Sequence, residues 1–319
     1  MNRRLAIGGL LLAAGGAAAA AFGWRRQRGN RMPDSLVLAP RPVLAPPADV
    51  RAVFHLGHSL VGPNMPAMLA QLGGHAYASQ LGWGTPLKAH WEEGEALAGY
   101  ELHASPGLSP APAREALASG GFDTLVLTEM VEIRDAIRYF DSSDYLARWV
   151  ALAREGNPQL RVYLYETWHR LDDADGWLER IEADLDENWL GRLIAPAEAA
   201  GATGTIYLIP GGQAIAAVAR AAEAGELPGL TSREDLFARD DAGGVDMIHI
   251  NDLGAYVVAL AHDAVIYQRS PVGLPHQLTR ADGSPADALE PEAARRVQEI
   301  VRDIVQRLPQ TGVAPDRLA

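Results

Sequence analysis

Five short apolar runs recur along this chain, and longer stretches of helical character separate them. The runs cover residues 50–54, 76–81, 124–128, 161–165 and 205–209. A strand reads as a continuous apolar run when helices cover both faces of a parallel sheet. Helices are expected at 66–72, 112–118, 143–155, 175–200 with a break at Pro196, 212–224, 252–268 and 291–307. We therefore predict a three-layer α/β/α sandwich of flavodoxin-like type around a five-stranded parallel sheet.

The composition supports one sizeable domain, which we place at residues 49–319. The chain has 319 residues, 48% of them hydrophobic, and this is ample for a continuous core. It contains no cysteine, which excludes a disulfide scaffold, a zinc–thiolate site, an iron–sulfur cluster and a cysteine nucleophile. The net charge of −12 argues against nucleic acid as a partner, because neutralising phosphates requires a basic face.

The N-terminal segment resembles a targeting sequence. Residues 5–24 carry no charge, and arginines flank this run on both sides. About 20 residues are enough to cross a bilayer as a helix, while the alanines at 17–21 resemble a signal-peptide cleavage region. We predict a signal peptide or membrane anchor at 1–28, and hence an exported, periplasmic or membrane-anchored protein that faces the cell envelope. Five prolines between 33 and 47 predict an extended linker at 29–48.

One serine stands where the first predicted strand breaks into a loop. The segment 54–60 reads Phe-His-Leu-Gly-His-Ser-Leu, and open α/β sheets bind ligands at such strand ends. Near the other end of the chain, Asp246 and His249 are three residues apart. Ser59, Asp246 and His249 follow one of the chain orders that can build a nucleophile, an orienting acid and a base. The alternative is that Asp246 is a turn residue and His249 an ordinary loop histidine.

These segments resemble the SGNH or GDSL-like hydrolase superfamily. The family's nucleophile block is matched by Gly-His-Ser-Leu at 57–60, and its Asp-x-x-His block by Asp246 and His249. The resemblance implies that Ser59 is the nucleophile, with no cofactor and no metal. Gly84, in the segment 82–87, resembles the oxyanion-binding glycine of the branch related to carbohydrate O-acetylesterases, or it is a simple turn glycine.

The third family block departs from the pattern. The family has Gly-x-Asn-Asp there, whereas this chain reads Leu-Thr-Glu-Met at 127–130. The missing asparagine would remove one oxyanion donor. Asn64 is our preferred substitute and Thr128 another, although Asn64 is equally well explained as a turn residue. Glu129 is expected to bind a sugar hydroxyl or to pair with Arg134 or Arg170.

Aromatic residues near the predicted strand ends suggest a sugar-binding surface. Trp168, Trp83 and Trp91 are candidates, of which we expect only one to lie in the site. The carboxylates at 172–186 are interpreted as the solvated face of an amphipathic helix rather than a metal site.

The function that follows is a serine esterase that cleaves acyl esters, in particular O-acetyl esters, from a carbohydrate through an acyl-enzyme. The expected substrate is a small molecule or a polysaccharide, and membrane attachment would come from the N-terminal segment. The alternatives are an acyltransferase that uses the same three residues and a non-catalytic glycan-binding envelope protein.

Overall fold

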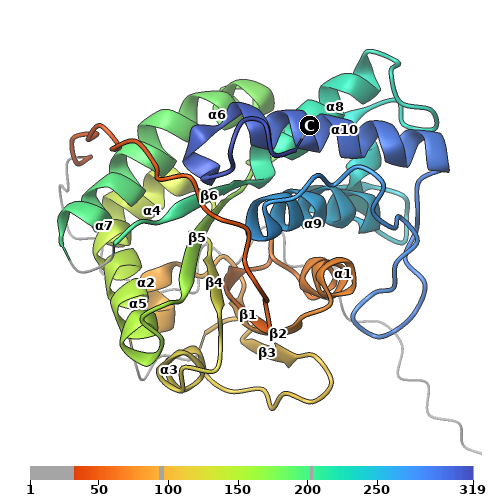
Figure 1. Cartoon of the computed structure of the whole chain (residues 1–319). Coiled ribbons are helices and arrows are strands. Elements are labelled where there is room, and N and C mark those ends of the chain that lie inside the picture. Colours follow the sequence, from red (N-terminus) through yellow and green to blue (C-terminus); the bar gives the residue numbers. More distant parts are fainter. Residues whose placement is uncertain (1–31, 93–96, 202–203, 319) are drawn as a thin grey trace, which may run out of the picture.

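A computed structural model describes residues 32–92, 97–201 and 204–318, and it shows a central six-stranded sheet (Figure 1). The strand order is β3-β2-β1-β4-β5-β6. The strands are β1 Ala52–His58, β2 Ala76–Gly82, β3 Glu101–Ala104, β4 Thr124–Leu127, β5 Arg161–Glu166 and β6 Tyr207–Pro210. Five of them run parallel, as the sequence predicts, and β3 adds an antiparallel edge. The sequence pattern missed β3 because this strand is only partly buried and its residues form no continuous apolar run.

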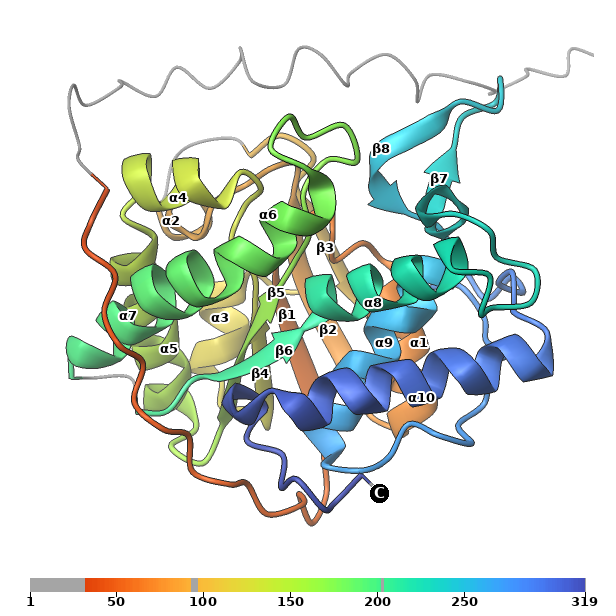
Figure 2. The ribbon, with the colours of Figure 1, turned by 90° about the horizontal axis from the view of Figure 1, so that it is seen from above.

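Helices cover both faces of the sheet, and this confirms the three-layer architecture. One layer consists of α1 Asn64–Gly73, α8 Gly211–Glu223, α9 Asp252–Tyr267 and α10 Pro291–Arg307. The other consists of α2 Leu87–Trp91, α3 Ala113–Ala118, α4 Ile133–Tyr139, α5 Ser142–Gly156, the π-helix η2 Leu185–Ile194 and α7 Ala195–Ala199. The helix α6 Trp177–Asp184 leads into η2, but it packs against α8, and its Trp177 and Ile181 belong to the core of the first layer. Figures 1 and 2 show the two layers on opposite sides of the strands.

The central strand β1 is buried along its whole length. Val53 contributes to the core beneath α1, α8, α9 and α10, whereas Phe54 and Leu56 contribute to the core on the other face. Successive side chains of a strand point to opposite faces, so each of the two cores anchors β1. The end of β1 is therefore a rigid place for a functional side chain.

The helical stretch 175–200 continues past Pro196, so the predicted break at this residue is wrong. The segments α6, η2 and α7 follow one another without a gap, and Pro196 lies in the first turn of α7. The change from π-helical to α-helical hydrogen bonding falls at this point. Proline has no N–H to donate to the preceding turn, and the change of hydrogen-bond pattern at this residue lets the helix continue without that bond.

A two-stranded hairpin stands beyond the carboxyl ends of the central strands. It follows a 3₁₀ turn, η3 Arg233–Leu236, and consists of β7 Phe237–Arg239 and β8 Val245–Ile250, which pair antiparallel. Figure 2 shows it on the side of α8 and α9. A second 3₁₀ turn, η4 Pro309–Thr311, follows α10.

The described part of the proline-rich segment, residues 32–48, forms no helix or strand. Its backbone is hydrogen-bonded to the domain, from the Leu36 amide to Gly191 O and from the Leu44 amide to Gly312 O, both at 2.8 Å. Arg41 adds an ion pair with Glu198 at 2.7 Å. These residues are therefore fastened along the domain surface. In the described part of the chain, no helix has the length and apolarity that crossing a membrane requires, and the segment predicted at 1–28 lies outside the described residues.

Candidate active site

Ser59 is the first residue after β1, and the turn that carries it is fixed by His58. The buried His58 ring places Nε2 2.8 Å from the carbonyl oxygen of Glu129, and its Nδ1 accepts the Leu60 amide at 3.4 Å. A carbonyl can only accept, so Nε2 carries the proton. Burial lowers the pKa of His58 to about 4, and the ring is therefore neutral at pH 7. The sequence pattern did not predict this positioning role for His58.

A second buried histidine supports the same strand end. His90 Nε2 lies 2.7 Å from the carbonyl oxygen of Gly57, and its Nδ1 lies 2.9 Å from Gln80 Nε2. Burial lowers the pKa of His90 to about 4. Gln80 Oε1 also accepts the Ala113 amide at 2.7 Å. The neutral, hydrogen-bonded side chains of His58 and His90 thus fix the backbone of the Gly57–Ser59 turn.

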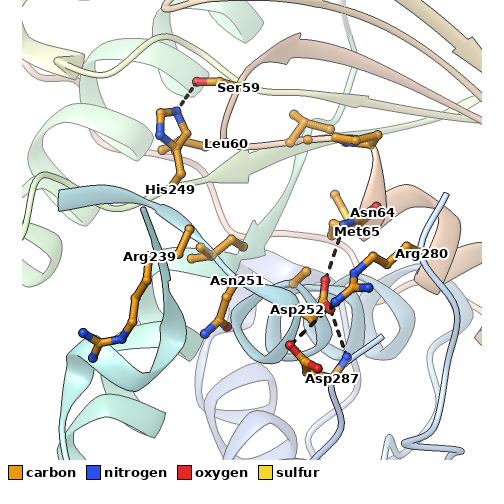
Figure 3. A pocket seen from close by; sticks show the side chains of 16 residues that line it. Ser59, Leu60, Asn64, Met65, Arg239, His249, Asn251, Asp252, Arg280 and Asp287 are labelled. Atoms are coloured by element: carbon orange, nitrogen blue, oxygen red, sulfur yellow. Dashed lines mark hydrogen bonds and ion pairs between the residues drawn. The ribbon is translucent and has the colours of Figure 1, made fainter. Parts of the chain in front are cut away.

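Ser59, His249 and Asp246 form a continuous hydrogen-bonded chain. His249 Nε2 lies 3.0 Å from Ser59 Oγ, and His249 Nδ1 lies 2.9 Å from Asp246 Oδ2. The carboxylate can only accept, so Nδ1 carries the proton and the lone pair of Nε2 faces the serine hydroxyl. His249 is 190 positions from Ser59 in sequence, and the fold brings the two side chains together (Figure 3).

The second oxygen of Asp246 ties this residue to its own strand. Asp246 Oδ1 accepts the amides of Ile248 at 2.8 Å and of His249 at 2.9 Å. Partial burial by itself raises the pKa of Asp246, but the hydrogen bonds from the His249 amide and ring and from the Ile248 amide outweigh it. The net effect is a pKa below the ordinary value, which keeps the carboxylate charged beside the imidazole.

The strand β8 is held by the segment that follows β5. Trp168 Nε1 donates to the carbonyl oxygen of Ile248 at 2.8 Å, and the Leu171 amide donates to the carbonyl oxygen of Met247 at 2.8 Å. Trp168 is fully buried and packs edge-on against Phe237 of β7. The prediction of Trp168 as a sugar-stacking residue is therefore wrong, because its ring lies beneath the hairpin and supports it.

Two candidate oxyanion donors are engaged elsewhere. The Thr128 hydroxyl donates to the carbonyl oxygen of Tyr165 at 2.8 Å and is buried. The side-chain Nδ2 of Asn64 donates to Asp252 Oδ1 at 3.4 Å, and its Oδ1 accepts the backbone amide of Ala281 at 3.2 Å. Figure 3 shows Asn64 turned toward Asp252, across the pocket from Ser59. The structure thus contradicts the prediction that either side chain replaces the missing asparagine.

Gly84 lies just beyond β2, beside the serine turn. Gly82 is the register partner of His58, so the chain leaves two adjacent strands at the same level. Gly84 has a φ of +54°, and a Cβ at this position would meet nothing within 4 Å. A glycine is therefore favoured here by the positive φ and not by crowding, and the space beside Gly84 is open.

Glu129 does not reach the surface. Its Oε1 accepts the Met130 amide at 2.8 Å and the Leu87 amide at 3.2 Å, and burial raises its pKa to about 7. Arg134 and Arg170 pair instead with aspartates of the 172–184 region. The predicted sugar contact and the predicted ion pairs of Glu129 are both wrong, because its side chain is completely buried and its carboxylate accepts backbone amides instead.

The 172–184 region is less solvated than the sequence indicates. Among the described residues, Glu132, His169 and Asp184 offer donor atoms close enough together to hold a metal ion. Arg180 Nη2, however, lies 2.6 Å from Glu132 Oε2 and 2.9 Å from Asp184 Oδ2. The Arg180 guanidinium thus bridges both carboxylates, and Arg134 pairs with Asp184 as well, so the group is a partly buried ion-pair network. The interpretation of a fully solvated helix face is wrong for Asp184, which is completely buried.

A pocket of about 370 Å³ adjoins the serine (Figure 3). Ser59 and His249 lie at one end, and Asp252, Arg280 and Asp287 lie at the other. Arg280 pairs with Asp252 at 2.6 Å and with Asp287 at 3.6 Å. Sequence analysis missed these residues because they come from α9 and from the loop before α10, and no motif links the two segments.

The comparisons with known proteins support the fold. A crystal structure of a DUF4886 family protein from Bacteroides uniformis superimposes with a TM-score of 0.55 at 14% identity, over 85% of this chain and 98% of that one. A "putative GDSL-like lipase" from Parabacteroides merdae aligns with a TM-score of 0.41 at 11% identity, over 71% of this chain and 99% of that one. No family model and no curated protein sequence matches the chain. The chain therefore shares an α/β/α fold with the first of these structures, and its function has to be argued from the site.

Proposed function

We propose that this protein is a serine esterase of SGNH type that removes acyl groups, in particular O-acetyl groups, from a carbohydrate. The observation that carries the proposal is the chain of contacts from Ser59 Oγ to His249 Nε2 at 3.0 Å and from His249 Nδ1 to Asp246 at 2.9 Å. Nucleophile, base and orienting acid are recognised by such geometry rather than by position in the sequence. The N-terminal segment supports export or membrane attachment at the cell envelope.

In the proposed reaction, His249 Nε2 takes the Ser59 proton as the hydroxyl oxygen attacks the ester carbonyl. The imidazolium is stabilised by the charged Asp246 carboxylate, and it then protonates the departing sugar oxygen. Water then attacks the acyl-enzyme while His249 Nε2 takes its proton. The proton passes to Ser59 Oγ as the carboxylic acid is released. We place the backbone amides of Ser59 and Gly84 around the developing oxyanion. With no asparagine in the third block, turnover should be slow, because losing one donor costs about a hundredfold or more.

Labelling with a fluorophosphonate probe tests this proposal. We expect covalent modification of wild type at Ser59, no labelling of Ser59→Ala and strongly slowed labelling of His249→Ala. Ser143→Ala, at a partly exposed position in the first turn of α5, provides a matched control that retains labelling. Equal labelling of wild type and Ser59→Ala, or none of either, would contradict the esterase and favour the glycan-binding alternative.

An acyltransferase uses the same three residues, and the second nucleophile distinguishes it from an esterase. The His249 side chain is 44% exposed, so water and a sugar hydroxyl both have access to the acyl-enzyme. Product analysis with p-nitrophenyl acetate, with and without an added oligosaccharide, separates the two. Free acetate alone supports the esterase, and acetylated oligosaccharide supports the transferase.

A further inference from the structure

Two aromatic side chains stand exposed beside the candidate active site. Trp83 is 49% exposed and Tyr100 is 44% exposed, which is uncommon for side chains of this size. The other exposed large apolar side chains of the described residues lie on the 32–48 segment, on the loop after β3 or at the end of α4. Among the residues that the structure describes, the exposed aromatic side chains near the strand ends are therefore Trp83 and Tyr100.

The sheet register places Trp83 beside the serine. His58 and Gly82 are the last paired residues of the parallel strands β1 and β2. Ser59 and Trp83 are the residues that follow them, and neighbouring strands of a sheet lie about 5 Å apart. The pocket described above is lined by the 59–65 turn, β7, β8 and the start of α9, and Trp83 is not among its lining residues. Trp83 thus follows the strand next to the one that carries Ser59, outside this pocket.

The indole of Trp83 is held in place by its neighbours. The backbone amide of Trp83 donates to the carbonyl oxygen of Ala98 at 2.7 Å. Gly99 lies directly against the ring, and a Cβ at this position would overlap with the indole Cδ1 and Nε1. Gly99 also has a φ of +62°. One side of the ring therefore rests on backbone that only glycine can provide, and this fixes the exposed side at little entropic cost.

Tyr100 connects this surface to the serine turn. Its hydroxyl lies 3.5 Å from Gln80 Oε1, and Gln80 contacts His90, which in turn contacts the carbonyl oxygen of Gly57. Tyr100 and the nucleophile turn are therefore linked through Gln80 and His90. Such preorganisation is what a substrate contact near a reacting centre requires.

We propose that Trp83, flanked by Tyr100, is the platform on which the sugar ring of the ester substrate stacks. This inference rests on the proposed esterase function. A pyranose has one face of C–H groups, which suits the negative face of an indole, and a rim of hydroxyls that stays in water. An open, flat aromatic surface fits such a ligand, whereas a long acyl chain would need an enclosed apolar channel. Of the three tryptophan candidates, Trp168 is buried, and Trp91 packs against Trp149 and Arg114.

The test compares a small ester with sugar esters. For wild type, Trp83→Ala, Trp83→Phe and Tyr139→Ala, kcat/KM is measured with p-nitrophenyl acetate, O-acetylated xylotriose and O-acetylated chitotriose. We expect the ratio of the sugar-ester value to the p-nitrophenyl acetate value to fall about tenfold in Trp83→Ala, mainly through KM, and less in Trp83→Phe. Tyr139 is an exposed aromatic residue at the end of α4, and its variant should keep the wild-type ratio.

Two outcomes would overturn the platform assignment. In the first, the ratio for Trp83→Ala equals that of wild type. In the second, Trp83→Ala instead lowers the ratio of p-nitrophenyl octanoate to acetate turnover, which would place an acyl chain on the indole. Fluorophosphonate labelling is run on the same samples. Absent labelling of Ser59 in wild type refutes the esterase itself, whereas normal labelling with an unchanged ratio refutes only the platform.

Discussion

The two sides of the candidate site are built in different ways. Ser59 extends a strand that is buried from end to end and anchored by cores on both faces. His249 and Asp246 lie on a two-stranded hairpin whose residues are only partly buried. The serine side thus takes its position from the main sheet, while the hairpin depends on a few hydrogen bonds from its neighbours. Substitutions in the hairpin should consequently affect activity more than stability, and substitutions beneath β1 should affect stability more.

The largest expected effect comes from the hairpin, at His249. We predict that His249→Ala lowers the rate of acyl-enzyme formation by about 10⁴-fold, because no other base replaces Nε2. The free energy of unfolding should change by less than about 0.5 kcal/mol, since the side chain is 44% exposed. Burst kinetics and urea denaturation measure the two quantities. A rate within tenfold of wild type would show that His249 is not the base.

The next prediction concerns acid stability, which depends on the sheet side. Burial lowers the pKa of His58, His75, His90 and His262 to about 4, and it also lowers the pKa of His55 well below its ordinary value. The unfolded chain therefore binds protons first as the pH falls below about 6.5, so this stability is complete above pH 6.5 and is lost toward pH 4.

Two buried glutamates act in the opposite direction. Burial raises the pKa of Glu129 to about 7 and of Glu166 to about 8, so the folded state gains protons as the pH falls from 8 toward 4.5. Five histidines outweigh two glutamates, and we expect a net loss on the order of 3 kcal/mol between pH 7 and 5.5. Urea denaturation across this range measures it. If stability stays constant or rises toward pH 5.5, the buried histidines are not held neutral in the folded state.

A smaller effect is expected where the domain holds the hairpin. Trp168→Phe keeps a buried ring but removes the donor to the carbonyl oxygen of Ile248. We predict a loss of about 1–2 kcal/mol of stability and a fall in kcat of about tenfold, because small displacements of a base are costly. Trp149→Phe is the matched control, since its Nε1 donates to the carbonyl oxygen of Leu87 at 3.0 Å from a fully buried ring. Equal losses of activity in both variants would refute a specific role for Trp168.

The smallest expected effect is at Asn251, between the hairpin and α9. Its Oδ1 caps α9 by accepting the Leu253 and Gly254 amides, while its Nδ2 donates to the carbonyl oxygens of Asp235 and Phe237. Asn251→Asp keeps the cap and loses the donors, so kcat should fall severalfold, with about 1 kcal/mol lost. Asn251→Ala loses both functions and should be less stable than Asn251→Asp. The reverse order of stability would show that the cap contributes little.

The pattern of the sequence was informative where one physical cause dominates. Buried parallel strands are apolar throughout, so all five could be located, and the long amphipathic helices followed from their period. The prediction that Ser59, Asp246 and His249 meet rested on two motif blocks that resemble a known superfamily, and the structure brings these three side chains together. The elements β3, α2 and α4 and the hairpin strands escaped because they are short or partly exposed, and tertiary contacts rather than local pattern define them.

The sequence by itself determined the three layers of this protein and which serine, aspartate and histidine are candidates for the site, because burial patterns and short motifs are local properties of the chain. Only the tertiary structure decided the roles of Trp168, Glu129, Thr128 and Asn64, since each depends on which distant backbone group its side chain reaches. The same holds for Trp83, whose exposed ring at the serine follows from the register of two strands and from a glycine 16 residues further along the chain. Long-range pairing of this kind leaves no periodic signal in a single chain.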